Sequence, residues 1–259
     1  MSTVTSRDGT LIGFDRIGDG PALVLVDGAM CYRASGPLVP LAHVLASRFT
    51  VYTYDRRGRG ESGDTPPYAV TREVEDLDAI IAEAGGSAYV FGMSSGAALA
   101  IEAAASGSPI TKLALYEPPY RTSDADPRRQ REYTEKLGST LAEGRRGDAV
   151  ELFMRMVGMP AETVAGMRGS PAWPVFEAIA PTLAYDDALL GDGSVPRDRT
   201  AKVTVPTLVV AGGSSPAFLR DAARATAEVI PGAELRTLDG QTHMLDPEVV
   251  GAVLTEFLA

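Results

Sequence analysis

Residues 92–96, with the sequence GMSSG, place a serine where it can act as a nucleophile. They follow the apolar run AYVF and precede an alanine-rich segment, so we expect Ser94 to stand on a sharp turn between a buried strand and a helix. The glycines two residues before and after Ser94 let the backbone close up there. Amide groups at the start of the helix then point towards whatever the serine binds. The alternative interpretation is an ordinary strand-to-helix turn.

The composition excludes several functional classes. The chain has 259 residues and a net charge of −10, and an acidic surface repels phosphate backbones, so we predict no nucleic-acid partner. Cys31 is the single cysteine, which predicts a protein without an internal disulfide in a reducing, cytoplasmic compartment. The polar N-terminus and the lack of a membrane-length apolar run predict no membrane partner. Widely separated histidines and the absence of a phosphate-loop motif predict no metal and no cofactor.

The elements that must position Ser94 alternate between strand and helix. An Asp8-Gly9 turn predicts a hairpin of strands 3–6 and 10–17. The alternation after it predicts an α/β fold, with a mostly parallel central sheet and helices on both faces. Strands are expected within 21–30, 49–62, 87–96, 111–120, 203–213 and 233–240, and helices within 37–49, 71–86, 95–106, 216–229 and 246–258.

One segment, residues 121–200, breaks the alternation. It has helical patterns at 128–142, 147–158 and 172–190 and no convincing strand. We interpret it as a helical lid inserted into a core domain made of residues 1–120 and 201–259, because insertions at the carboxyl ends of strands commonly cover a site.

The chain resembles the α/β-hydrolase family over almost its whole length. Besides G-x-S-x-G, three motifs carry the resemblance: VDGA at 26–29, YDRRGRGES at 54–62 and GQTHML at 240–245. The order of the candidate serine and histidine along the chain also fits. The resemblance implies the α/β-hydrolase fold with a nucleophilic serine.

The resemblance also implies acyl-transfer chemistry. Ser94 would attack, and His243 would be the base that removes its proton. The backbone amides of Ala29 and Ser95 would hold the oxyanion. The other histidine, His43, lies on a predicted helix face and is interpreted as structural.

The acid of the triad departs from the usual family pattern. Ser215 stands where the family usually has its aspartate, and serine cannot stabilise an imidazolium as a carboxylate does. Glu117 follows the preceding strand of the sheet, where some family branches carry the acid, and is our candidate. It could instead be a structural glutamate that caps a lid helix or pairs with an arginine. Asp221, on the next predicted helix, and Asp239, in a turn, are weaker candidates.

Asp27 replaces the histidine that the family usually has beside the oxyanion loop. A carboxylate there opposes the forming oxyanion unless it is protonated or paired, so we expect a partner in Arg56, Arg57 or a lid arginine, or else an unusual substrate or reaction. Nearby Cys31 is interpreted as a small packing residue. The candidate site-lining residues are Asp27, Met93, Cys31 and Trp173.

We therefore predict a serine-dependent hydrolase of a small, apolar ester, lactone or thioester, with oligomeric state left open. Ser94, in place of an aspartate, argues against epoxide hydrolase and dehalogenase chemistry. Carbon–carbon bond hydrolysis and specialised-metabolite cyclisation on the same scaffold stay open. The alternative is a non-hydrolytic ligand-binding or sensor protein on a degenerate hydrolase scaffold, which the missing acid and Asp27 favour.

Overall fold

The strands form one mixed sheet. The computed structural model describes residues 2–122 and 127–259, and an eight-stranded sheet within them runs in the order β1-β2-β4-β3-β5-β6-β7-β8. β1 pairs antiparallel with β2, and β2 with β4, whereas the other neighbouring strands are parallel. The predicted mostly parallel sheet is therefore confirmed. The strands are β1 (Ser2–Thr5), β2 (Leu11–Ile17), β3 (Ala22–Val26), β4 (Thr50–Tyr54), β5 (Ala88–Met93), β6 (Ile110–Tyr116), β7 (Thr207–Gly212) and β8 (Glu234–Leu238).

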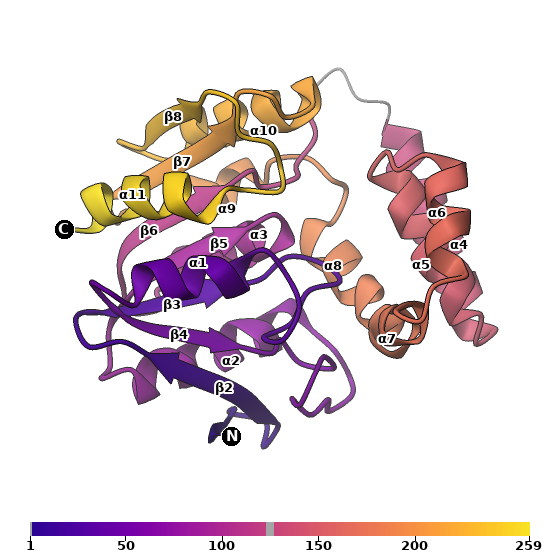
Figure 1. The fold of residues 1–259 in the computed structure, drawn as a ribbon, viewed down its shortest axis with the longest axis horizontal. Coiled ribbons are helices and arrows are strands. Elements are labelled where there is room, and N and C mark those ends of the chain that lie inside the picture. Colours follow the sequence, from indigo (N-terminus) through magenta and orange to yellow (C-terminus); the bar gives the residue numbers. More distant parts are fainter. Residues whose placement is uncertain (1, 123–126) are drawn as a thin grey trace.

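Helices cover both faces of the sheet (Figure 1). On one face, α1 (Leu38–Leu45) and α11 (Pro247–Leu258) pack against each other and on β3, β4 and β7. On the other face lie α2 (Val70–Glu83), α3 (Ser95–Ser106) and α10 (Ala217–Val229). The sheet is buried from both sides, which is why its central parallel strands read as continuous apolar runs. None of the helices in the described ranges combines the length and the apolarity needed to cross a bilayer.

The sheet order brings the candidate residues to one edge. Asp27 follows β3, Ser94 follows β5, Glu117 follows β6, and His243 lies in the loop after β8. β3, β5, β6, β7 and β8 are successive parallel neighbours, so the carboxyl ends of all five point the same way. In open α/β sheets, ligand sites form at this edge.

A helical insertion separates β6 from β7 in the sequence, as predicted. The helix expected over 172–190 is broken by the 3-10 turn η1, which contains Pro181, a residue without a backbone N–H donor. Two helices, α6 and α9, are not predicted by the pattern, because glycine and proline beside them suggest breakers. The insertion comprises α4 (Pro127–Ala142), α5 (Arg146–Met156), α6 (Ala161–Arg168), α7 (Trp173–Ile179), η1 (Ala180–Thr182), α8 (Leu183–Leu190) and α9 (Arg197–Thr200).

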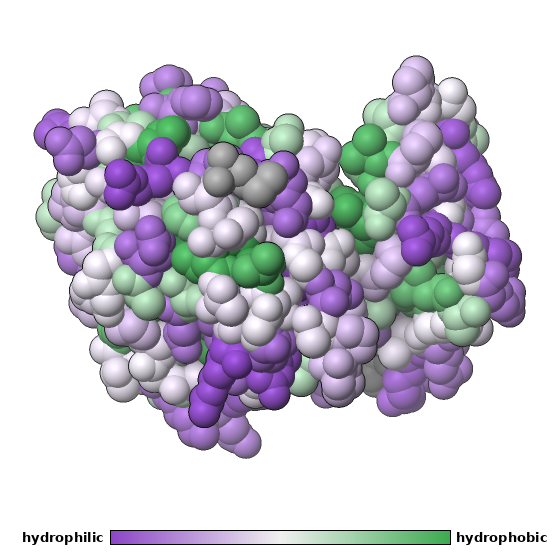
Figure 2. Space-filling model, turned by 90° about the horizontal axis from the view of Figure 1, so that it is seen from below, coloured by the Kyte–Doolittle hydropathy of each residue, from purple (hydrophilic) through white to green (hydrophobic). Residues whose placement is uncertain are grey.

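The insertion has an apolar core of its own. Leu137, Val150 and Trp173 are buried in it, and Met30 from the loop after β3 joins the same cluster. Figure 1 shows α4–α7 standing to one side of the sheet, with α8 nearer to it. α8 packs against α2 and α3 of the core. Figure 2 shows a cleft between the two bodies with apolar residues along its wall.

Alanine substitution at two helical glycines should change the stability of the protein in opposite directions. A Cβ on Gly96 would overlap the carbonyl oxygens of Val26 and Asp27, whereas a Cβ on Gly138 would meet nothing within 4 Å. Gly96→Ala should lower the free energy of unfolding by about 3 kcal/mol or more, because β3 and α3 must move apart. Gly138→Ala, on an exposed helix position, should raise it by about 0.5–1 kcal/mol.

Urea denaturation of both variants measures these changes. Equal destabilisation by the two substitutions would contradict the close approach of α3 to β3.

Candidate active site

Ser94 lies on a strained turn between β5 and α3. Its backbone has φ 54° and ψ −126°, a conformation that residues other than glycine rarely adopt. A Cβ on Gly92 would press on the backbone of Gly96 and Ala97, so the motif glycines are there because the turn closes on itself. Ser94 accepts the first helical hydrogen bond, from the Ala97 amide at 2.9 Å. The turn thereby presents a partly exposed serine at the carboxyl edge of the sheet.

Glu117 and His243 are brought together. Glu117 Oε2 lies 2.6 Å from His243 Nδ1, although the residues are 126 positions apart. The Glu117 side chain is fully buried, and that of His243 is 32% exposed. Burial raises the pKa of Glu117, but hydrogen bonding to His243 and the Gly212 amide outweighs burial, and the pKa stays below its ordinary value. Among the described residues, no hydrogen bond joins Ser94 to His243.

The Glu117 carboxylate reaches His243 across the end of β7. The Gly212 amide, at the end of that strand, donates to Glu117 Oε1 over 2.8 Å. Glu117 itself has φ 47°, and its amide donates to Val210 over 3.0 Å, so both ends of the residue are held by β7. Ser215 is 2% exposed. Its hydroxyl lies close enough to help lower the pKa of Glu117 but makes no well-formed hydrogen bond.

Tyr116 holds the loop that carries His243. Its buried phenol donates a 2.6 Å hydrogen bond to the carbonyl of Thr242. Two consecutive residues at the end of β6 thus contact two consecutive residues of this loop: Tyr116 binds the carbonyl of Thr242, and Glu117 binds the imidazole of His243. Sequence reasoning misses Tyr116, because a tyrosine at the end of an apolar strand is indistinguishable from an ordinary core residue.

The loop after β3 lies directly against Ser94. A Cβ on Gly28 would be 3.0 Å from Ser94 Cβ and 3.6 Å from Ser94 Oγ. Ala29 follows, and Met30 has φ 61°, which turns the chain back sharply. The two predicted oxyanion amides, those of Ala29 and Ser95, therefore come from segments that both adjoin Ser94.

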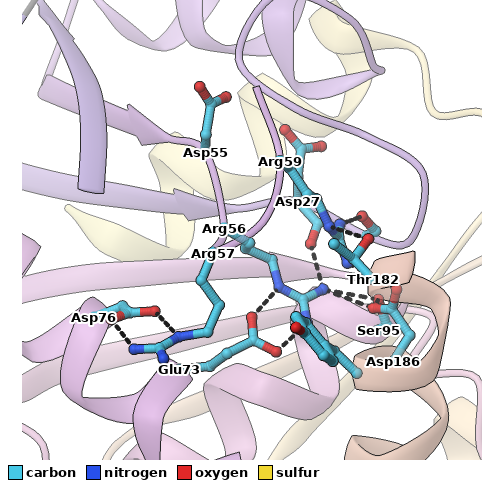
Figure 3. A network of polar contacts seen from close by, with 12 residues as sticks. Asp27, Asp55, Arg56, Arg57, Arg59, Glu73, Asp76, Ser95, Thr182 and Asp186 are labelled. Atoms are coloured by element: carbon cyan, nitrogen blue, oxygen red, sulfur yellow. Dashed lines mark hydrogen bonds and ion pairs between the residues drawn. The ribbon is translucent and has the colours of Figure 1, made fainter. Parts of the chain in front are cut away.

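Buried ion pairs surround this loop (Figure 3). Arg56 and Arg59 are each 1% exposed and share the carboxylate of Asp186, at 2.9 and 2.7 Å. Asp186 also accepts a 2.7 Å hydrogen bond from the Ser95 hydroxyl. Although burial opposes it, the charges of Arg59 and Arg56 hold the pKa of Asp186 below its ordinary value. Because Asp186 belongs to α8, the insertion is bound to the turn at Ser94 through charge.

Asp186 is not a sequence-predicted residue, although a signal for it exists. Three arginines occur within YDRRGRGES, beside an apolar strand, and buried guanidinium groups require carboxylate partners. Arg57 finds Asp76 at 2.7 Å, and Arg56 finds Glu73 at 2.6 Å, both on α2. Counting charges in this way predicts that further acidic residues converge on the motif, but it does not say which helix supplies them.

The pairing predicted for Asp27 is wrong. Arg56 donates to the backbone carbonyl of Asp27, at 3.3 Å, and not to its side chain. Asp27 is 5% exposed, and its Oδ1 has no hydrogen-bond partner among the described residues. In Figure 3 the carboxylate points away from the guanidinium of Arg56. Burial raises the pKa of Asp27 to about 7, despite the charges of Arg59 and Arg56. Protonation, the other alternative from the sequence, is therefore within reach at and below about pH 7.

None of the remaining candidates is a hydrogen-bond partner of Glu117 or His243 among the described residues. Burial raises the pKa of the Cys31 thiol to about 12, so it is a packing residue and not a thiolate. Trp173 is 4% exposed in the core of the insertion, where its indole N–H donates to Glu177 over 3.0 Å. Met93 is buried next to Ser94, and His43 is exposed on α1. Of the weaker acids, Asp221 pairs with Arg224 on α10 and Asp239 lies exposed in a turn.

Comparison with known proteins gives the family. The sequence model of the alpha/beta hydrolase family matches residues 23–253. The chain belongs to the α/β-hydrolase family. The match spans β3 to α11 and includes the turn at Ser94, the insertion and the His243 loop.

Several known proteins are similar to this chain in structure or in sequence. An α/β hydrolase from Sphaerobacter thermophilus is 54% identical, with a TM-score of 0.90 and complete coverage of both chains. An enol-lactonase from Burkholderia xenovorans is 21% identical, with a TM-score of 0.73 over 99% of both chains. An N-formylmaleamate deformylase from Pseudomonas putida is 38% identical over 106 residues. That last match spans 39% of each chain.

The raised pKa of Asp27 predicts a pH-dependent stability. Between about pH 4 and pH 7 the unfolded chain loses this proton while the folded chain keeps it. The free energy of unfolding should therefore fall across that window, by up to about 4 kcal/mol, and should change no further from this group above it. Asp27→Asn removes the titration, so its stability relative to the wild type should rise from pH 4 to pH 8. Denaturation at both pH values measures this, and a constant difference would contradict a raised pKa.

Proposed function

We propose that the chain is a serine-dependent acyl hydrolase of small, apolar esters, lactones or thioesters. The observation that carries the proposal is the 2.6 Å contact between Glu117 and His243, beside a serine held at φ 54°. A buried carboxylate on Nδ1 fixes the imidazole so that Nε2 is free to accept a proton. The family and the described relatives are consistent with acyl transfer, since a lactonase and a deformylase are among them.

In this proposal, Ser94 Oγ attacks the substrate carbonyl carbon while His243 Nε2 takes the serine proton. The electron pair of the carbonyl bond moves to oxygen, where the amides of Ala29 and Ser95 hold the negative charge. Collapse expels the alcohol or thiol, protonated by His243, and leaves an acyl-serine. Water, deprotonated by His243, then releases the acid. Glu117 stabilises the imidazolium in both halves of the reaction.

The insertion is proposed to act as a lid that shapes an apolar pocket. Met30, next to the candidate oxyanion amide of Ala29, is buried in the apolar cluster of the insertion, so that cluster extends to the loop beside Ser94. Tyr32, Phe153, Met156 and Phe176 pack at the partly exposed margin of that cluster. Such a surface favours an apolar acyl or leaving group.

A non-hydrolytic sensor is the second candidate, and Asp27 is the observation that favours it. A carboxyl group at this position weakens oxyanion binding whenever it is ionised. A fluorophosphonate probe separates the two candidates, because it labels an activated serine and leaves an inert one unmodified.

Ser94 is the residue that the probe should label. Wild-type protein should give a stoichiometric adduct on the peptide that contains Ser94, and Ser94→Ala should give none, with turnover of an activated ester abolished and the thermal unfolding midpoint nearly unchanged. Intact-mass spectrometry measures the adduct. Full turnover by Ser94→Ala would contradict the assignment.

Glu117→Gln should lower kcat by about 10³–10⁴-fold, because the amide keeps the shape of the side chain but supplies no charge to the imidazolium. Ser215→Ala should change kcat by less than about threefold, since the Ser215 hydroxyl makes no hydrogen bond to His243 among the described residues. Adding Ser215→Asp to Glu117→Gln should restore at least tenfold of the loss, if a carboxylate at the end of β7 also reaches Nδ1.

Steady-state kinetics on one activated ester compares the variants, with circular dichroism as the control for folding. Equal losses in Glu117→Gln and Ser215→Ala would rule out Glu117 as the acid.

A further inference from the structure

The carbonyl of Gly28 is bound by a buried arginine. Arg59 Nη1 donates to this oxygen over 2.6 Å, and the same nitrogen contacts the carbonyl of Cys31 at 3.3 Å. Both oxygens belong to the loop that lies against Ser94. The motif position of Arg59, the variable residue between Gly58 and Gly60, gives no sign of this contact.

Because the peptide group is planar, the contact with Arg59 also determines the direction of the Ala29 N–H. The carbonyl of Gly28 and the N–H of Ala29 belong to one planar group, and in a trans peptide they point in opposite directions. The one cis bond among the described residues is Pro66–Pro67, so this peptide is trans. Arg59 lies on the carbonyl side. The N–H of Ala29 therefore points away from Arg59, and Gly28 packs on Ser94.

Charge adds strength to that orientation. Hydrogen bonding to the oxygen of an amide polarises the group and makes its N–H a better donor. A guanidinium with 1% exposure acts through few water molecules, so its charge is weakly screened. The arginine is itself fixed, by Asp186 at 2.7 Å and by a 3.1 Å hydrogen bond from Nε to Thr182.

We propose that Arg59 is a positioning residue for the oxyanion hole, which aims and polarises the amide of Ala29. Asp186 and Thr182, from the insertion, hold Arg59 in place, so the insertion sets the geometry of the oxyanion hole as well as covering it. The other proposed donor is linked to the same carboxylate, since Asp186 accepts from the hydroxyl of Ser95 at 2.7 Å. This inference rests on the proposed function, and the experiment below separates the two.

Arg57 offers a matched control for Arg59. It is equally buried and comes from the same loop, and it too binds carboxylates and a backbone carbonyl, those of Asp8, Asp76 and Arg72. None of these partners lies in the loop beside Ser94. Arg59→Lys and Arg57→Lys therefore remove contacts of the same kinds from equally buried sites, but only Arg59→Lys releases carbonyls of the loop beside Ser94.

Kinetics give the first test. Arg59→Lys should lower kcat by about 10–100-fold, with KM changed by less than about threefold, because a misdirected amide affects the transition state more than the bound ester. Binding of a trifluoromethyl ketone, whose adduct with Ser94 carries an oxyanion, should weaken by a similar factor. Arg57→Lys should leave kcat and ketone binding within about threefold of the wild type, at a temperature where both variants are folded. Equal losses in the two variants would overturn the proposal.

A measurement that needs no catalysis gives the second test. The amide ¹⁵N shift of Ala29 reports hydrogen bonding to the preceding carbonyl, so it should move in Arg59→Lys and stay in place in Arg57→Lys. If Ala29 responds in this way but the wild type neither hydrolyses esters nor reacts with fluorophosphonate, the proposed function fails and the orienting contact stands. If the wild type is active and Ala29 does not respond to Arg59, the inference fails and the proposed function stands.

Discussion

Arg56 and Arg59 place two positive charges in the interior and share one carboxylate, that of Asp186. A buried charge is tolerated when it is paired and hydrogen-bonded, and removal of one partner typically costs about 3–5 kcal/mol. Asp186 belongs to the insertion, so the core supplies a carboxylate for Arg56, that of Glu73, but Arg59 is paired only when α8 has docked. The same carboxylate receives the hydroxyl of Ser95, and Arg59 binds the carbonyl of Gly28. Docking of the insertion and the arrangement of the loops around Ser94 are therefore coupled through the same contacts.

The same pairing of charges explains why the Asp27 carboxyl group has no cationic partner. The charges of Arg56 and Arg59 are already matched by Glu73 and Asp186, and no cation remains in this cluster for a third carboxylate. Burial then decides, and it raises the pKa of Asp27 to about 7. A neutral carboxyl group is compatible with an oxyanion forming nearby, whereas a charged one opposes it. The missing partner is thus a consequence of the network and not a defect in it.

Sequence reasoning reaches Ser94, His243 and Glu117 because each follows a strand, and strand ends converge on one edge of a parallel sheet. It does not reach Asp186, whose place depends on how α8 packs on α2 and α3. The wrong pairing of Asp27 has a related cause. Proximity along the chain identifies charges that can meet, but burial and competing partners decide which of them do. Which residue follows a strand can be read from the local sequence. Which charged groups pair in the interior depends on tertiary packing.

Three residues other than glycine, among those described, have positive φ: Met30, Ser94 and Glu117. Each follows a strand at the carboxyl edge, and each such conformation costs of order 1–3 kcal/mol. The surroundings that hold them differ. Glu117 is bonded at both ends to β7, the carbonyl of Ser94 accepts a hydrogen bond from the first turn of α3, and Met30 is buried in the core of the insertion. Strain in the core loops is thus balanced partly by packing from outside the core, so loosening the insertion should relax the loop at Met30 before it disturbs Glu117.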